Sequence, residues 1–118
     1  MKFGGGAFEG QYSFSSRFEE GPGTNPEELI AAAHAGCFSM AFSNGLAKDG
    51  FTPTRVSTTA KLTLEGGVII TIDLVCEAIV PGISEQKFME LGEVARATCP
   101  VSKALAGPKI SLQAKLLA

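Results

Sequence analysis

The sequence contains no tryptophan, one tyrosine and one histidine, and its three cysteines form no Cys-x-x-Cys pair. A single histidine excludes a catalytic scheme that rests on several imidazoles. The absent Cys-x-x-Cys spacing excludes the usual zinc knuckle and the thioredoxin-type motif. Three widely spaced cysteines are also untypical of small secreted proteins, which usually carry an even and denser set.

An excess of charge of one sign is also missing. Ten Lys and Arg oppose twelve Asp and Glu, giving a net charge of −2 at pH 7. Because nucleic-acid binding requires clustered basic residues, the composition predicts no nucleic-acid partner. The apolar runs are broken by Gly, Ser, Asn or Asp before the roughly 18 residues of a membrane span, so we expect no membrane partner. The N-terminus lacks a basic, apolar and cleavage-site pattern, which predicts a cytoplasmic protein.

The chain is 118 residues long and 45% hydrophobic, which predicts one folded domain over residues 1–118 and excludes a disordered chain. A domain of about this length buries only roughly two-thirds of its unfolded surface when it folds alone. With 14 glycines and several strongly apolar stretches, we expect a second copy of the chain to complete the core.

Hydrophobic periodicity predicts an α+β domain with a mainly antiparallel sheet. In the first segment, residues 1–18, four aromatic residues fall on even positions: Phe8, Tyr12, Phe14 and Phe18. The expected elements are an extended segment within 1–18, a helix over 26–47, strands over 56–65 and 70–80 around a Gly66-Gly67 turn, a helix over 85–98 capped by Ser84, a short helix from Pro100 to near Gly107-Pro108, and a strand over 110–116.

The long helix has a clear start signal. Asn25 suits the N-cap, Pro26 suits the first helical position, and Glu27 and Glu28 suit the positive end of the helix dipole. From there to residue 47 nearly every side chain is apolar or small. A helix that is apolar all round is typical of burial on all sides, so we expect a buried central helix.

Cys37 on this helix is the first candidate for chemistry. A reactive thiolate there requires a nearby positive charge, because apolar burial raises a thiol's pKa and the helix dipole fades within the first turn. Arg17 is the candidate cation, and Glu27 the acid that orients its guanidinium through a bidentate pair. Each residue also has a structural alternative. Cys37 could be a packed core cysteine, Arg17 a surface arginine of the extended segment, and Glu27 a first-turn acid that interacts only with the helix dipole.

Cys99 precedes Pro100 at a predicted helix start, where backbone N–H groups favour a thiolate. It is either a resolving cysteine for Cys37 or a packed cap. Cys76 lies on the apolar side of its strand and is interpreted as a core residue. His34 and Cys37 have the spacing of half a zinc site, but we favour a hydrogen-bonded helix histidine because no recognised spacing supplies the other half.

Glu27 and Cys37 lie ten residues apart, about 15 Å along a straight helix. One subunit therefore cannot place both in one site unless the helix bends. Two central helices packed antiparallel about a two-fold axis would bring the start of one close to the middle of the other.

At these residues the sequence resembles the OsmC/Ohr family, the osmotically inducible protein C and organic hydroperoxide resistance proteins. The resemblance covers nearly the whole chain. It is closer to the OsmC branch, because Arg17 directly precedes Phe-Glu and the glycine loop. The matching runs are residues 12–19, 23–41, Gly50-Phe51-Thr52-Pro53-Thr54, Val80-Pro81-Gly82-Ile83 and Cys99-Pro100-Val101-Ser102.

The resemblance implies a thiol-dependent peroxidase with Cys37 as the peroxidatic cysteine, Cys99 as the resolving cysteine and Arg17 with Glu27 as the activating pair. It implies an intertwined homodimer with active sites at the subunit interface, and no metal, haem or flavin. The implied substrates are organic hydroperoxides, with hydrogen peroxide used less well. The implied reductant is a dithiol such as dihydrolipoamide or a lipoylated protein.

The resemblance also implies a shorter N-terminal strand region than is usual in the family, which we expect to affect stability more than chemistry. An apolar pocket for bulky hydroperoxides has four candidate lining residues, with ordinary core as the alternative for each: Phe14, Phe18, Phe38 and Met40. The principal rival function is a non-catalytic protein of the same fold that binds a hydrophobic ligand, and a small zinc protein is the third.

Overall fold

The computed structural model describes residues 1–13 and 23–117 in two compact units, Met1–Ile30 and Ala31–Ala118. The expectation of a single domain over residues 1–118 therefore stays a prediction.

In the described part of the N-terminal unit, the expected extended segment forms short backbone pairings. Lys2 and Glu9 form an antiparallel bridge, and Tyr12 and Thr24 form a parallel one. Gly23 has a φ of 82°, and a Cβ at this position would lie 2.4 Å from the Gln11 carbonyl oxygen, so only glycine fits. The extended segment is thus present as bridges in the described part, while Phe14 and Phe18 lie outside the described residues.

Helix α2 (Pro26–Lys48) begins and ends where the sequence predicts. At its start the Glu28 backbone N–H donates to Asn25 Oδ1 over 2.8 Å, which satisfies one of the free N–H groups of the first turn. At its end Gly50 adopts a φ of 91°. The Gly50 N–H then donates to the Ala47 carbonyl, and the Phe51 N–H donates to the Leu46 carbonyl. These two hydrogen bonds form a Schellman cap.

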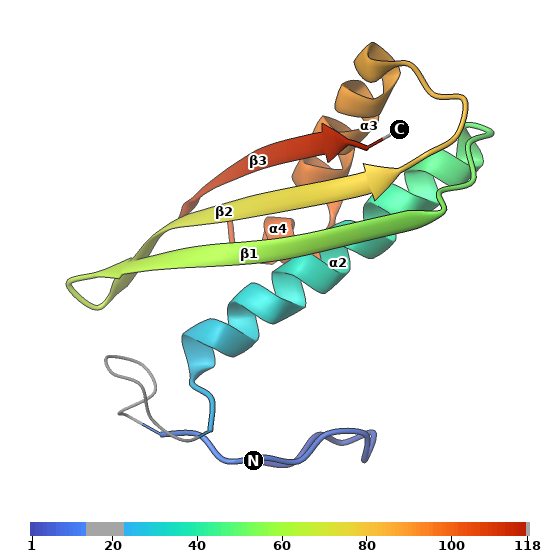
Figure 1. Ribbon diagram of the computed structural model, residues 1–118. Coiled ribbons are helices and arrows are strands. Elements are labelled where there is room, and N and C mark those ends of the chain that lie inside the picture. The colour runs from blue at the N-terminus through green and yellow to red at the C-terminus, as the bar shows by residue number, and fades with distance from the viewer. Residues whose placement is uncertain (14–22, 118) are drawn as a thin grey trace. The chain divides into compact units, whose positions relative to one another are not determined.

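A three-stranded sheet follows in the second unit, in the order β1 (Arg55–Glu65), β2 (Val68–Ile79), β3 (Lys109–Leu116). Strands β1 and β2 are antiparallel and joined by a tight turn at Gly66 and Gly67, whose φ angles of 59° and 78° favour glycine. Strand β3 pairs with β2 in parallel. A parallel pair requires a long crossover, which here consists of α3 (Glu85–Thr98) and α4 (Pro100–Ala104) (Figure 1).

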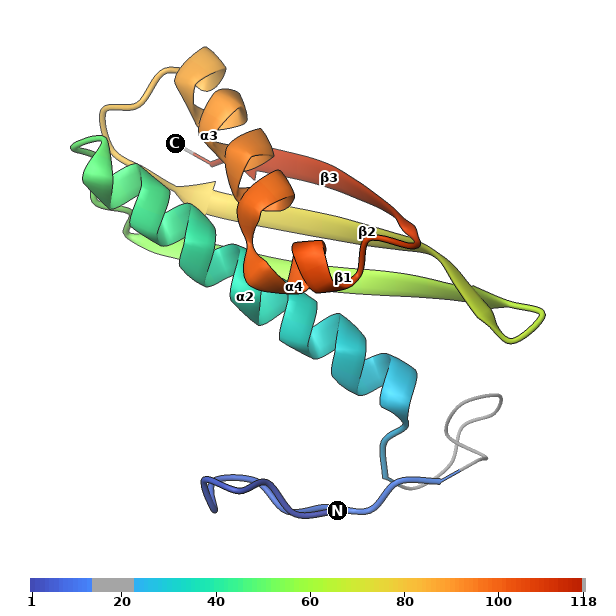
Figure 2. The same cartoon turned by 180° about the vertical axis from the view of Figure 1, so that it is seen from behind.

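The helices of the second unit cover one face of this sheet (Figure 2). Alternate residues of β2 point into the layer between sheet and helices, where Ile72, Leu74, Cys76 and Ala78 are fully buried. Opposite them three rings pack in a row, with Phe42 5.5 Å from Phe38 and 5.2 Å from Phe88 between ring centroids. This core fixes α2 and α3 against the sheet.

Only one side of α2 contributes to that core. Its buried residues are Ala31, His34, Ala35, Phe38, Phe42 and Leu46. On the opposite side Met40 is 76% exposed. The prediction of burial on all sides is therefore wrong for the single chain, because the sheet and α3 cover one face only.

Helix α2 is also long and apolar enough to cross a membrane, judged by length and composition alone. The sequence expectation concerned unbroken apolar runs, and Gly, Ser and Asn do interrupt α2; the helix meets this criterion because hydropathy is averaged over 18 residues. The buried helix of a compact protein meets the same criterion, and α2 contributes Phe38, Phe42 and Leu46 to the core.

Candidate active site

Cys37 lies in the middle of α2, half-buried, with its sulfur beside α4. Burial is the largest influence and raises the pKa of the Cys37 thiol. A hydrogen bond with the Val101 backbone lowers this pKa, and the neighbouring Cys99 side chain raises it. The structure therefore brings Cys37 and Cys99 together, while their roles as peroxidatic and resolving cysteine stay predictions.

Cys99 occupies the junction between α3 and α4. Its backbone is extended, with φ −62° and ψ 139°, because the following Pro100 disfavours the helical region. Its N–H closes α3 on the Ala95 carbonyl, and its sulfur accepts the Ser102 backbone N–H at 3.4 Å. The side chain is 1% exposed. The predicted break at Cys99 and the helix start at Pro100 are confirmed, although α4 ends at Ala104, before the expected Gly107.

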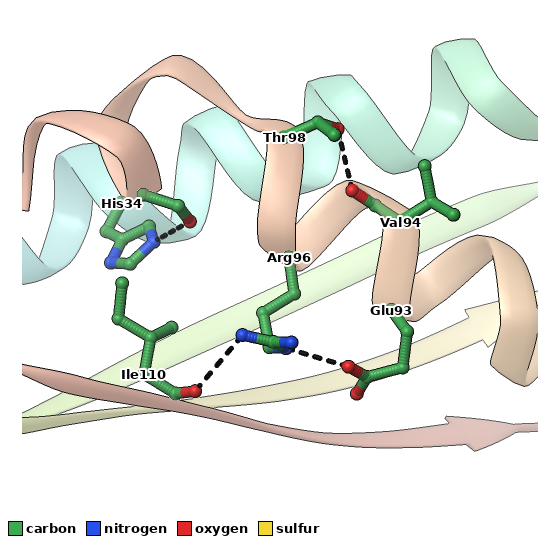
Figure 3. A network of polar contacts seen from close by, with 7 residues as sticks. His34, Glu93, Val94, Arg96, Thr98 and Ile110 are labelled. Carbon is green, nitrogen blue, oxygen red and sulfur yellow. Dashed lines mark hydrogen bonds and ion pairs between the residues drawn. The ribbon is translucent and has the colours of Figure 1, made fainter. Parts of the chain in front are cut away.

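A buried polar chain connects α2 with this junction. His34 Nε2 lies 2.7 Å from Ser102 Oγ, and Ser102 Oγ lies 3.0 Å from Cys99 Sγ. Figure 3 shows the His34 contact as a dashed line from its ring. His34 is fully buried, which lowers its pKa. The interpretation of His34 as a hydrogen-bonded helix histidine is confirmed, whereas Ser102 was missed as a site residue; its signal is a hydroxyl three residues after a helix-capping cysteine.

An open apolar groove runs along the exposed side of α2. Its lining residues are Ala33, Gly36, Cys37, Met40, Ala41, Asn44 and Pro100. Cys37 is thus accessible from the groove, while Cys99 lies behind it. Of the residues expected to line an apolar pocket, Met40 does so and Phe38 belongs to the core.

No cation among the described residues contributes to the pKa of Cys37. Arg96, on the adjacent α3, contacts Glu93 at 2.8 Å and the Ile110 carbonyl at 3.4 Å (Figure 3). Arg17 lies outside the described residues. Glu27 is half-buried in the first turn of α2, within the N-terminal unit. The activating roles of these two residues therefore stay predictions.

Cys76 is fully buried on the inner face of β2, and burial raises the pKa of its thiol. Its interpretation as a core cysteine is confirmed. Across residues 1–13 and 23–117, no three His, Cys, Asp or Glu side chains are grouped so as to hold a metal ion.

The model of the OsmC-like protein family matches residues 19–113. The chain belongs to this family. Peroxiredoxin OsmC of Escherichia coli is 51% identical over 98 residues, covering 80% of this chain and 68% of the relative. The organic hydroperoxide resistance protein of Xanthomonas axonopodis pv. citri is 35% identical over 91 residues, covering 74% and 63%. The identity to the OsmC protein is higher than that to the organic hydroperoxide resistance protein. This agrees with the closer resemblance to the OsmC branch that the sequence around Arg17 indicated.

Solved structures of OsmC-like proteins have the same fold. An OsmC-like protein from Mycoplasma pneumoniae superposes with a TM-score of 0.75 at 18% identity, covering 83% of this chain and 75% of that one. An organic hydroperoxide resistance protein from Legionella pneumophila gives a TM-score of 0.73 at 22% identity, covering 98% and 87%. The predicted α+β, OsmC-like fold class is confirmed.

Proposed function

We propose that this OsmC-family chain is a thiol-dependent peroxidase that reduces organic hydroperoxides, and hydrogen peroxide less well, through Cys37 and Cys99. The observation that carries the proposal is the pairing of two free cysteines with unequal exposure. Cys37 opens onto an apolar groove, and Cys99 lies buried beside it. The printed names of the relatives, peroxiredoxin OsmC and organic hydroperoxide resistance protein, support the same activity.

The reaction begins at Cys37. Its thiolate attacks one peroxide oxygen, the O–O bond breaks, and the departing alkoxide takes a proton and leaves as an alcohol. Cys37 is now a sulfenic acid, which condenses with the Cys99 thiol and releases water. A dithiol reduces the resulting disulfide by two successive exchanges and leaves oxidised. The sum is one hydroperoxide and one dithiol converted to alcohol, water and a disulfide.

The thiolate form of Cys37 requires help, since burial raises its pKa. We assign this help to Arg17, oriented by Glu27, because a guanidinium close to sulfur favours the anion and a carboxylate fixes its fork geometry. This assignment rests on the motif match. It also agrees with the spacing of ten residues between Glu27 and Cys37, which favours residues from two subunits in one site.

A homodimer with active sites at the interface would use the exposed side of α2. Met40 there is 76% exposed, and small residues beside it permit close approach of another helix. The same apolar groove favours hydroperoxides with alkyl chains over hydrogen peroxide, because apolar area buried on binding adds affinity. Recycling by a reduced dithiol, dihydrolipoamide or a lipoylated protein, places the enzyme in a reducing compartment such as the cytoplasm.

The test treats the reduced full chain with one equivalent of cumene hydroperoxide and maps the cysteines by mass spectrometry without reductant. We expect a Cys37–Cys99 disulfide and consumption of the peroxide. Cys37→Ser removes both, and Cys76→Ser serves as the matched control that retains both. Unchanged thiols with intact peroxide would contradict the proposal and favour a non-catalytic binder of hydrophobic ligands.

A further inference from the structure

Two members of the polar chain that ends at Cys99, His34 and Ser102, have no role in the proposed peroxidase reaction. Three side chains from α2 and the α3–α4 junction form the polar chain, and all three are buried: His34 0%, Ser102 6% and Cys99 1% exposed. Ser102 contacts the Cys99 sulfur twice, through its hydroxyl at 3.0 Å and its backbone N–H at 3.4 Å. His34 Nε2 contacts the same hydroxyl at 2.7 Å.

The second ring nitrogen of His34, Nδ1, shows which atoms donate in these hydrogen bonds. His34 Nδ1 is buried and has no hydrogen-bond partner among the described residues. Burial lowers the pKa of His34, so the ring is neutral at pH 7 and carries one N–H. A proton on Nδ1 would be a buried donor without an acceptor, which is rare and costly. The proton therefore sits on Nε2 and is donated to Ser102 Oγ, which leaves the Ser102 hydroxyl free to donate to Cys99 Sγ.

Both Ser102 donors are thus directed at the Cys99 sulfur, and His34 orients one of them. Hydrogen bonds to a charged atom are about twice as strong as those to a neutral one. This arrangement therefore interacts most favourably with Cys99 when its sulfur carries negative charge. Both Cys37 and Cys99 are free thiols in the structure, so these contacts belong to the reduced form of the chain.

We propose that Ser102 and His34 are positioning residues that direct how the Cys37–Cys99 disulfide opens. A reductant thiolate attacks Cys37 Sγ, the S–S bond breaks, and the electron pair goes to Cys99 Sγ, which leaves as the thiolate held by Ser102. The second thiol of the reductant, after losing its proton to solvent, then attacks the mixed disulfide and releases Cys37. This inference rests on the proposed disulfide and specifies which sulfur the reductant joins.

The accessibility of the two sulfurs agrees with this order. Cys37 lines the open groove, and Cys99 is absent from the groove lining and nearly inaccessible. A thiol that enters along the groove meets Cys37 first. Because the leaving-group sulfur strongly affects the rate of thiol–disulfide exchange, the donors at Cys99 should accelerate attack on Cys37.

The test uses the full chain oxidised with diamide, so that the disulfide forms without any peroxide. Limiting 2-mercaptoethanol is added, the reaction is acid-quenched within the first turnover, and mixed disulfides are mapped by mass spectrometry. We expect about tenfold more adduct on Cys37 than on Cys99. In the Ser102→Ala and His34→Leu variants, 2-mercaptoethanol should open the Cys37–Cys99 disulfide about three- to tenfold more slowly. This is the size expected from the loss of one hydrogen bond to a developing anion.

Conservative variants separate positioning from a general structural role. Ser102→Thr keeps the hydroxyl and His34→Gln keeps an N–H donor, so both should recover most of the rate. Ser39→Ala is the matched control, since it removes another hydrogen bond made by a serine, 2.6 Å from Ser39 Oγ to Thr58 Oγ1, in which neither Cys37 nor Cys99 takes part. In this control the Cys37–Cys99 disulfide should open at the wild-type rate.

Adduct mainly on Cys99, or unchanged rates in both Ser102→Ala and His34→Leu, would overturn the inference. If Ser102→Ala does not fold, the comparison of His34→Leu with His34→Gln decides the question. Failure of the peroxidase proposal would appear separately, as intact cumene hydroperoxide in a chain whose diamide-formed disulfide still opens as expected.

Discussion

Titration of His34 should make the stability of the folded chain depend on pH in a simple way. His34 is the sole histidine of the sequence, it is fully buried, and burial lowers its pKa below the ordinary value of 6.5. When the chain unfolds, the ring returns to water and to its ordinary pKa. Between the two pKa values the unfolded chain therefore binds one more proton than the folded chain.

The sign and the upper limit of the effect follow from linkage. Stability from the neutral ring is fully present above pH 6.5 and is lost as pH falls from there towards the lowered pKa of the folded state. For one proton the slope is at most about 1.4 kcal/mol per pH unit, so the free energy of unfolding falls by up to about 1.4 kcal/mol between neutral pH and pH 5.5.

Urea unfolding at pH 7.5, 6.5 and 5.5, at fixed protein concentration and in excess reductant, measures this slope. His34→Gln retains an N–H donor for Ser102 and does not titrate, so the wild-type slope minus the variant slope isolates the imidazole. A difference near zero, or a wild-type chain that gains stability as pH falls, would refute the assignment of a buried neutral histidine.

Three further predictions concern the proposed site and its helix. Arg17→Met should slow alkylation of Cys37 by iodoacetamide at pH 7 about tenfold or more, and Arg17→Lys less; equal rates would contradict a role in thiolate formation. Met40→Glu should weaken self-association about a hundredfold or more in sedimentation, with loss of cumene hydroperoxide turnover, because it places an unpaired charge in the proposed interface; Val94→Glu, at an exposed site of α3, is the control. Asn25→Ala should lower the free energy of unfolding by about 1 kcal/mol, while Asn25→Asp preserves the cap, and equal urea midpoints would show that the cap contributes nothing.

Local signals in the sequence predicted most of the elements correctly. The alternation in β1 and β2 and the Gly66-Gly67 turn predicted the hairpin, and Asn25 and Ser84 predicted the helix starts. These features depend on neighbours in the chain, so a pattern of a few residues carries the information. The same reasoning placed Cys99 at a helix break, because proline restricts the residue before it.

Local patterns could not predict the features that depend on contacts between distant parts of the chain. The apolar alternation of β3 does not reveal that it pairs with β2 in parallel, since orientation is set by the α3–α4 crossover. The one-sided burial of α2 depends on what covers it. The contact of His34 with Ser102 joins residues 68 positions apart, and nothing in the sequence of either segment indicates it.

The three cysteines show how the fold gives one residue type three different chemical environments. Cys76 points from β2 into the packed layer, where it is fully buried and burial raises the pKa of its thiol. Cys37 faces the groove, since its turn of α2 lies at the border between the buried and exposed sides. Cys99 is held at a helix junction, where its sulfur contacts both the hydroxyl and the backbone N–H of Ser102. A nucleophile requires access and a leaving group requires stabilised charge, so these positions support the roles that we propose for Cys37 and Cys99.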